Sequence, residues 1–124
     1  MSSGSKGNQI NRFLKSFVFA FKGIIHTIQQ ERNMKIHLVA ALLVIILGLN
    51  IHLSAIEWMF IFFAIGGVLS LELVNTAIER TVDLVTKEFH PLAKQAKDIA
   101  AGAVLIYALI SIIIGCIIFL PKIF

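Results

Sequence analysis

Cysteine and charge are both scarce in this sequence, and each scarcity excludes a class of protein. The single cysteine, Cys116, lies in an apolar run, so the chain has no disulfide framework. Charged residues make up only 15% of the 124 residues, whereas hydrophobic residues make up 58%. A soluble domain of this size cannot bury so much apolar side chain, so we expect an integral membrane protein.

Metal clusters and phosphate-binding loops are also missing from the sequence. Neither GxxxxGK(S/T) nor GxGxxG occurs, so a nucleotide site would differ from that of standard kinases. The net charge of +4 does not indicate nucleic-acid binding, because the basic residues gather beside apolar runs, as in membrane proteins. The histidines do not share a helical face at ligand spacing, which argues against a zinc site; they are His26, His37, His52 and His90.

Apolar patterning predicts one all-α membrane domain over residues 10–124, after a disordered segment at residues 1–9. Over residues 10–30, apolar side chains recur at steps of three and four opposite basic ones, which predicts an amphipathic helix in the membrane interface. This stretch is not a continuous apolar run, so we expect no cleavable signal peptide. We expect three transmembrane helices at about 34–51, at 54–78 with an extension to about 89, and at 98–120.

Local signals define the ends of the second transmembrane helix. Ser54 and Glu57 have the spacing of a capping box, which predicts the start of this helix. Pro91 is expected to end it, because proline disfavours helix at the preceding residue, and residues 92–98 are expected to form a polar return. Glycines inside the second and third spans are expected to permit close packing of helices; they are Gly66, Gly67, Gly102 and Gly115.

The distribution of lysine and arginine predicts how the chain is oriented in the membrane. Of the 11 basic residues, all but Lys122 lie before the first span or between the apolar parts of the second and third spans. Lysine and arginine gather on the cytoplasmic side of membrane proteins. We therefore expect a multi-pass cell-membrane protein with its N-terminus and residues 72–98 in the cytoplasm and its C-terminus outside.

The most informative stretch is E-L-V-N-T-A-I-E-R-T-V-D at residues 72–83. With about 100° per residue on an α-helix, Asn75, Glu79 and Asp83 lie at about −60°, −20° and +20° from Glu72. This acidic stripe begins inside a hydrophobic segment, where an ionisable group costs about 2.5–3.5 kcal/mol and by default indicates function. Stacked carboxylates also repel one another unless a cation or a proton lies among them.

These residue types suit phosphoryl transfer from a nucleotide to a lipid alcohol. Glu72, the deepest acid, could take a proton from an alcohol whose tail stays in the lipid. Glu79 could hold Mg²⁺, with Glu31 as a second carboxylate if the N-terminal helix folds back. Lys97 and Asp98 could meet a triphosphate and a cation, respectively.

Other interpretations explain only part of this pattern. A helix end emerging into water would account for Asp83 but not for the whole stripe. A small transporter or proton relay also places acids in its spans, but here the acids lie toward one membrane surface and the third span has none. A non-enzymatic assembly subunit would explain the glycines as packing sites, but it gives no reason for Glu72 to lie so deep.

The stretch at residues 72–83, together with Ala96-Lys97-Asp98, resembles the small bacterial diacylglycerol kinase family, and the resemblance extends from Arg12 to about Leu120. E-R-N-M-K-I-H at 31–37 and E-F-H-P-L-A-K at 88–94 resemble the branch that phosphorylates undecaprenol. The resemblance implies a MgATP-dependent kinase that makes undecaprenyl phosphate, the lipid carrier for cell-wall synthesis. Diacylglycerol, giving phosphatidic acid, is the alternative acceptor.

The resemblance also implies a homotrimer with composite active sites at the subunit boundaries. Glu72 would be the general base, and Asn75 would help to hold the γ-phosphate. Glu31 and Glu79 would bind the metal, and Asp83 would support the site. Phe19 replaces an aromatic hydroxyl found elsewhere in the family. The ATP-binding positions of the family correspond to Arg12, Phe19, Glu31, Glu79, Glu88, His90, Lys97 and Asp98.

Overall fold

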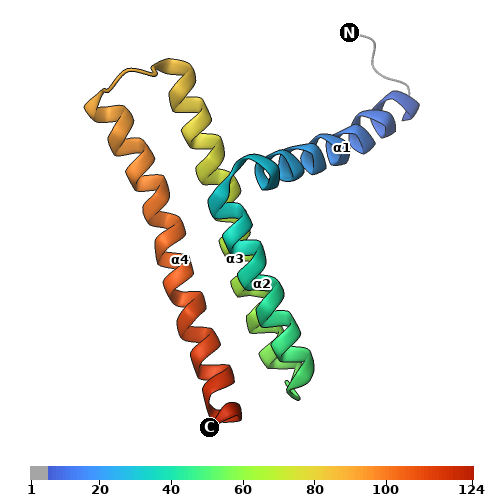
Figure 1. The fold of residues 1–124 in the computed structure, drawn as a ribbon. Helices are drawn as coiled ribbons and strands as arrows, with labels where there is room; N and C mark the ends of the chain where they lie inside the picture. The colour runs from blue at the N-terminus through green and yellow to red at the C-terminus, as the bar shows by residue number, and fades with distance from the viewer. Residues whose placement is uncertain (1–5) are drawn as a thin grey trace.

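The computed structural model describes residues 6–124 as four helices: α1 (Lys6–Gln30), α2 (Arg32–Asn50), α3 (Ala55–Val85) and α4 (Pro91–Ile123). Helix α3 packs against both α2 and α4, while α1 extends away from these three at a steep angle (Figure 1). Helices α2, α3 and α4 are each long and apolar enough to cross a membrane. The prediction of an all-α fold with three helices able to cross a membrane is therefore confirmed for residues 6–124.

Helix α1 begins before the expected boundary. Residues 6–9, which we expected to be disordered, form its first turn, whereas residues 1–5 lie outside the described residues. Extending an existing helix adds about one hydrogen bond for each residue fixed, so polar residues can join a helix that the apolar pattern nucleates further along.

The capping box at the start of α3 is confirmed. The Glu57 amide donates to Ser54 Oγ at 3.2 Å, and the Ser54 amide donates to Glu57 Oε1 at 3.0 Å. Lys122 Nζ near the end of α4 lies 3.3 Å from the same Glu57 oxygen. Glu57 is therefore a structural residue that joins the start of α3 to the end of α4, at the far end of α3 from the acidic stripe.

The expected polar return at residues 92–98 is wrong, because these residues form the first turns of α4. Pro91 starts this helix as its first residue, where the missing N–H and the fixed φ of proline are favourable. The His90 ring caps it, with Nδ1 accepting a hydrogen bond from the Leu92 amide at 3.1 Å. Lys97 and Asp98 are consequently held on a rigid helix rather than on a loop.

Helix α3 ends at Val85, four residues before the expected end near 89. Thr86 has extended backbone angles, and its hydroxyl oxygen accepts a hydrogen bond from the Glu88 amide at 3.1 Å. Such local hydrogen bonds from threonine compete with helix formation. Glu88 and His90 therefore belong to the short connection between α3 and α4.

Close packing between α3 and α4 depends on Gly67. A Cβ atom at this position would overlap the Tyr107 ring, and the Tyr107 hydroxyl donates to the Phe63 carbonyl at 3.0 Å. The expected packing role is thus confirmed for Gly67. It is not seen within this chain for the other three glycines, which have open space around the Cβ position; they are Gly66, Gly102 and Gly115.

Candidate functional site

The four residues of the predicted stripe lie along α3, and the two nearest the middle of the helix are buried. Glu72 is 2% exposed and Asn75 is 5% exposed, while Glu79 and Asp83 are half-buried. Asn75 Nδ2 donates a hydrogen bond to Glu79 Oε1 at 3.0 Å, so these side chains share one face of the helix. The stripe thus runs from a water-excluded carboxylate to acids that water can reach.

The carbonyl oxygen of the Asn75 side chain is buried and has no hydrogen-bond partner within residues 6–124. A buried polar atom without a partner costs about 1–3 kcal/mol, and such atoms are rare in native structures. Its neighbours along the stripe are carboxylates, which accept hydrogen bonds but cannot donate them when ionised. The site therefore presents an oxygen that is free to receive a cation or a donor group from a ligand.

Helix α2 brings His37 to the deepest acid. His37 Nε2 lies 3.8 Å from Glu72 Oε2, and the two side chains are 23% and 3% exposed. The sequence pattern alone does not indicate His37 as part of the site. The available signal was that His37 is one of two polar residues in the apolar stretch 36–51, but periodicity along one helix does not show which residue of another helix it faces.

Arg80 connects the junction of α1 and α2 to α3. Its Nη2 donates to Glu31 Oε1 at 3.1 Å, and its Nη1 lies 2.9 Å from His26 Nε2. Glu31 stands between α1 and α2 in an extended conformation. Arg80 was also missed from the sequence, although its position next to Glu79 could have drawn attention to it. The structure thus brings Glu31 to Arg80 on α3, although α1 itself extends away from the bundle (Figure 1).

Two lysines at the start of α4 pair with nearby acids. Lys97 Nζ lies 2.7 Å from Asp83 Oδ1, which joins the first turns of α4 to the last turns of α3. Lys94 Nζ pairs with Asp98 Oδ2 on the same helix, and both side chains are exposed. Lys97 is therefore near the outer end of the stripe, whereas Asp98 faces its own lysine.

Four of the predicted nucleotide positions are not brought to Glu72 within one chain. Helix α1, which carries Arg12 and Phe19, extends away from the bundle (Figure 1), and Phe19 is 64% exposed. Glu88 and His90 are exposed in the connection between α3 and α4, beyond the end of the stripe. Within residues 6–124 of one chain, the assembled part of the predicted site consists of the stripe on α3, Glu31 at the junction of α1 and α2, and Lys97 at the start of α4.

The proposed metal residues fit Mg²⁺ as a partial donor set. No group of three His, Cys, Asp or Glu side chains suited to a metal occurs among residues 6–124. Magnesium in phosphoryl-transfer sites takes one or two carboxylates and completes its coordination with phosphate oxygens and water. Glu31 and Glu79 supply two carboxylates, and the unpartnered Asn75 oxygen is of the same hard type. The donor chemistry therefore fits a cation that arrives with a nucleotide.

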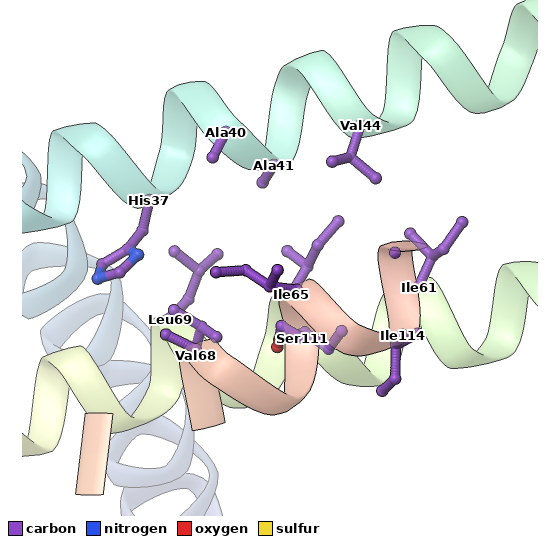
Figure 2. Close-up of a pocket in the computed structure, with 14 residues that line it drawn as sticks. His37, Ala40, Ala41, Val44, Ile61, Ile65, Val68, Leu69, Ser111 and Ile114 are labelled. Carbon is purple, nitrogen blue, oxygen red and sulfur yellow. The ribbon is translucent and has the colours of Figure 1, made fainter. Parts of the chain in front are cut away.

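An apolar cavity of about 320 Å³ lies between α2, α3 and α4. His37 stands at one end of the row of lining residues, and Ile61 and Ile114 stand toward the other (Figure 2). Val68 and Leu69 line the cavity one helical turn before Glu72. The cavity therefore runs within the apolar part of the three spans and ends beside the buried carboxylate.

Comparison with known proteins identifies the family to which the chain belongs. The family model described as prokaryotic diacylglycerol kinase matches residues 18–119. A Bacillus subtilis (strain 168) protein named undecaprenol kinase is 59% identical over 122 residues, which are 98% of this chain and 99% of the relative. Two proteins named diacylglycerol kinase also match. The one from Synechocystis is 41% identical over 87% of this chain and 62% of its own length, and the one from Escherichia coli K12 is 30% identical over 86% and 87%. The chain therefore belongs to the prokaryotic diacylglycerol kinase family.

Proposed function

We propose that this protein transfers the γ-phosphate of ATP to undecaprenol and forms undecaprenyl phosphate. The observation that carries the proposal is the position of Glu72, which is 2% exposed and lies beside the end of an apolar cavity within the membrane spans. A long-chain alcohol can keep its chain in such a cavity while its hydroxyl group reaches the carboxylate. The 59% identity with a protein named undecaprenol kinase favours this acceptor.

Glu72 acts as the general base in the proposed reaction. Its carboxylate accepts the proton of the lipid hydroxyl as the hydroxyl oxygen attacks the γ-phosphorus. The bond from the γ-phosphorus to the β–γ bridging oxygen breaks, and ADP leaves with that electron pair. Because Glu72 is shielded from water, its interaction with the developing charge is stronger than it would be in solvent, and competing hydrolysis is suppressed.

The outer part of the stripe holds the nucleotide. Mg²⁺, when bound, would neutralise charge on the phosphates, and Glu31 and Glu79 are its proposed ligands. Asn75 is fixed by its hydrogen bond to Glu79 and presents its free oxygen to the reacting groups. Lys97 would contact the phosphates, with Asp83 holding it in place at 2.7 Å. Other contacts to ATP are proposed for Arg12, Phe19, Glu88, His90 and Asp98.

The assembled protein is proposed to be a homotrimer with its active sites at the subunit boundaries. Helix α1, which carries Arg12 and Phe19, extends away from the other three helices of its own chain (Figure 1). A neighbouring subunit would supply these residues to the site. Apolar side chains such as Phe13 and Phe17 are exposed on α1, which suits a helix lying in the membrane interface. The N-terminus and the site would be cytoplasmic, where ATP is present, and the C-terminus would be outside.

Diacylglycerol is the second candidate acceptor, because relatives of 30% and 41% identity carry the name diacylglycerol kinase. Both lipids present a hydroxyl group on an apolar chain, so the stripe alone does not choose between them. The test is transfer of radiolabelled γ-phosphate from ATP to undecaprenol and to diacylglycerol, each in the same mixed detergent micelles. We expect faster transfer to undecaprenol. Faster transfer to diacylglycerol would reverse the choice, and transfer to neither would refute the proposed kinase.

A further inference from the structure

We propose that His37 binds the hydroxyl group of the acceptor lipid together with Glu72 and so positions it for transfer. The inference rests on the proposed lipid kinase function and adds to it a contact from a second helix. Glu72 alone gives the hydroxyl one partner, and one partner does not fix its direction.

The first observation is the gap between the two side chains. His37 Nε2 and Glu72 Oε2 are 3.8 Å apart, which is too long for a hydrogen bond between them. A hydroxyl oxygen can nevertheless lie within about 2.8 Å of both atoms at once, because hydrogen bonds of this type have that length. Polar groups at such a separation are commonly bridged by a third polar group. The two atoms are therefore close enough for one hydroxyl oxygen to contact both of them.

The second observation is that the His37 ring lacks a hydrogen bond of its own. Its one close polar neighbour in the described part of the chain is Glu72. The other polar side chain that lines the cavity, Ser111, differs in this respect. Its hydroxyl donates to the Tyr107 carbonyl at 2.8 Å and is therefore satisfied within its own helix. Of these two polar residues, His37 is the one whose side chain is available to a ligand.

The third observation identifies the kind of ligand. The cavity beside His37 is lined by alanine, valine, leucine and isoleucine side chains from three helices, and no lysine or arginine lines it (Figure 2). A phosphate group would find no positive charge there, whereas an apolar chain would fit. His37 and Glu72 meet at one end, and the Ser111 hydroxyl along the lining is already satisfied by the Tyr107 carbonyl, so a matching ligand is apolar along its length and carries a polar group at its tip. A lipid alcohol has this chemistry.

The two partners have different tasks. A neutral imidazole with its proton on Nε2 donates to the hydroxyl oxygen, and the hydroxyl then points its own hydrogen at the Glu72 carboxylate. During transfer this hydrogen moves to Glu72 and the oxygen forms its bond to the γ-phosphorus, while His37 keeps its proton. His37 thus directs the lone pairs and the hydrogen of the hydroxyl without taking part in proton exchange.

The test compares three variants of the full-length protein in micelles that contain undecaprenol. His37→Phe keeps a planar ring but removes the donor, and His37→Gln keeps an N–H donor. His52→Phe, in the connection between α2 and α3, is the matched control for loss of a histidine. For each variant, kcat and KM are measured separately for the lipid and for ATP, and thermal stability is recorded.

We expect His37→Phe to lower kcat/KM for undecaprenol roughly tenfold, the usual effect of one lost hydrogen bond, with the KM for ATP unchanged. His37→Gln should recover part of the loss, and His52→Phe should match the wild type. If His37→Phe is unstable, His37→Gln is compared with His37→Ala instead. We expect kcat/KM for undecaprenol to fall less in His37→Gln than in His37→Ala, because glutamine keeps an N–H donor.

The proposal is overturned if His37→Phe keeps wild-type kinetics for the lipid, or if its KM for ATP rises in parallel with the loss. A wild-type protein that phosphorylates neither undecaprenol nor diacylglycerol would instead refute the proposed function. The wild-type assay therefore separates the two failures. If diacylglycerol is the faster acceptor, the same variants are compared on that lipid.

Discussion

Glu72 has almost no contact with water, and its surroundings determine what it can do. Its nearest polar neighbour on another helix, His37, is 3.8 Å away and does not neutralise it when uncharged. An ionised carboxylate in such a place is costly, and a protein retains one where it has a function. Glu79 lies two helical turns further along and has more solvent access. The two acids therefore suit different tasks, proton acceptance at depth and cation binding near the surface.

Glu79→Gln tests the cation-binding task. The substitution keeps the size of the side chain and an oxygen that can accept from Asn75 Nδ2, but it removes the charge. We expect the KM for MgATP and the Mg²⁺ concentration for half-maximal activity to rise together, each roughly tenfold or more, as is usual for weakened metal sites. Glu57→Gln, on the same helix but at its other end, should change neither value. An unchanged Mg²⁺ requirement in Glu79→Gln would contradict the assignment.

The sequence predicts the stripe well and its partners poorly, for a physical reason. Residues 72–83 share a helix, so the fixed rotation per residue places their side chains relative to one another. His37 and Arg80 act between helices, and their partners depend on how α2 and α1 are rotated and tilted against α3. Periodicity within one helix carries no information on that rotation. Glu31 could be predicted as a second carboxylate for Mg²⁺ only on the condition that the N-terminal helix folds back, because its position depends on the fold at the junction of α1 and α2.

At the scale of the elements, α3 and α4 form the best-packed pair and carry most of the site between them. The Lys97–Asp83 ion pair joins these helices at the end near the stripe, and the Lys122–Glu57 pair joins them at the other end. Between these pairs, Tyr107 lies against the backbone of α3 at Gly67. The distance between α3 and α4 is therefore fixed at three levels along their length.

Gly67→Ala tests the close approach of these helices. The added methyl group would overlap the Tyr107 ring, and overpacking of this kind typically costs about 1–3 kcal/mol. We expect a lower midpoint of thermal unfolding in detergent. Gly66→Ala is the matched control, since its new methyl group meets open space in this chain. Adding Tyr107→Ala to Gly67→Ala should restore part of the loss, and an equal midpoint for Gly67→Ala and the wild type would refute the contact.

The start of α4 shows why helix ends were harder to predict than helix interiors. Proline disfavours helix at the residue before it and is favourable as the first residue of a helix. Pro91 therefore marks a boundary between helices, but residues 92–98 form the start of α4 rather than the expected polar return. The capping of α4 by the His90 ring had no sequence pattern as clear as the Ser54–Glu57 box of α3. The end of α3 at Val85 was also not predictable from the sequence. The hydrogen bond of Thr86 favours the end of the helix there, but a single threonine can also occur inside a helix.

At the scale of the whole molecule, the orientation in the membrane places the site with respect to ATP. A single cysteine introduced at Lys87, between α3 and α4, should react with a membrane-impermeant thiol reagent only after the cytoplasmic face is exposed. A cysteine at His52, between α2 and α3, should react in intact cells, because the basic residues gather at the other end of the bundle. Both variants are made with Cys116 replaced by serine. The reversed labelling pattern would contradict the proposed orientation.

The proposed assembly can be tested by mixing subunits. Arg12 is on α1, which extends away from the other helices of its chain (Figure 1), but it would meet Glu72 in a site that two subunits share. Arg12→Ala and Glu72→Gln should each be inactive alone, while co-expression of the two should restore part of the activity. The restored activity arises from sites that combine the intact α1 of one subunit with the intact α3 of its neighbour. Co-expression that remains inactive would contradict shared sites.

The most direct measurement of the central claim is a single-turnover assay of Glu72→Gln with ATP and undecaprenol prebound. The substitution keeps the shape of the side chain and removes its ability to take a proton. We predict that the rate of phosphoryl transfer falls by at least about 100-fold, in line with the usual contribution of a general base, while the affinity for ATP stays at the wild-type value. A transfer rate close to that of the wild type would show that Glu72 is not the base.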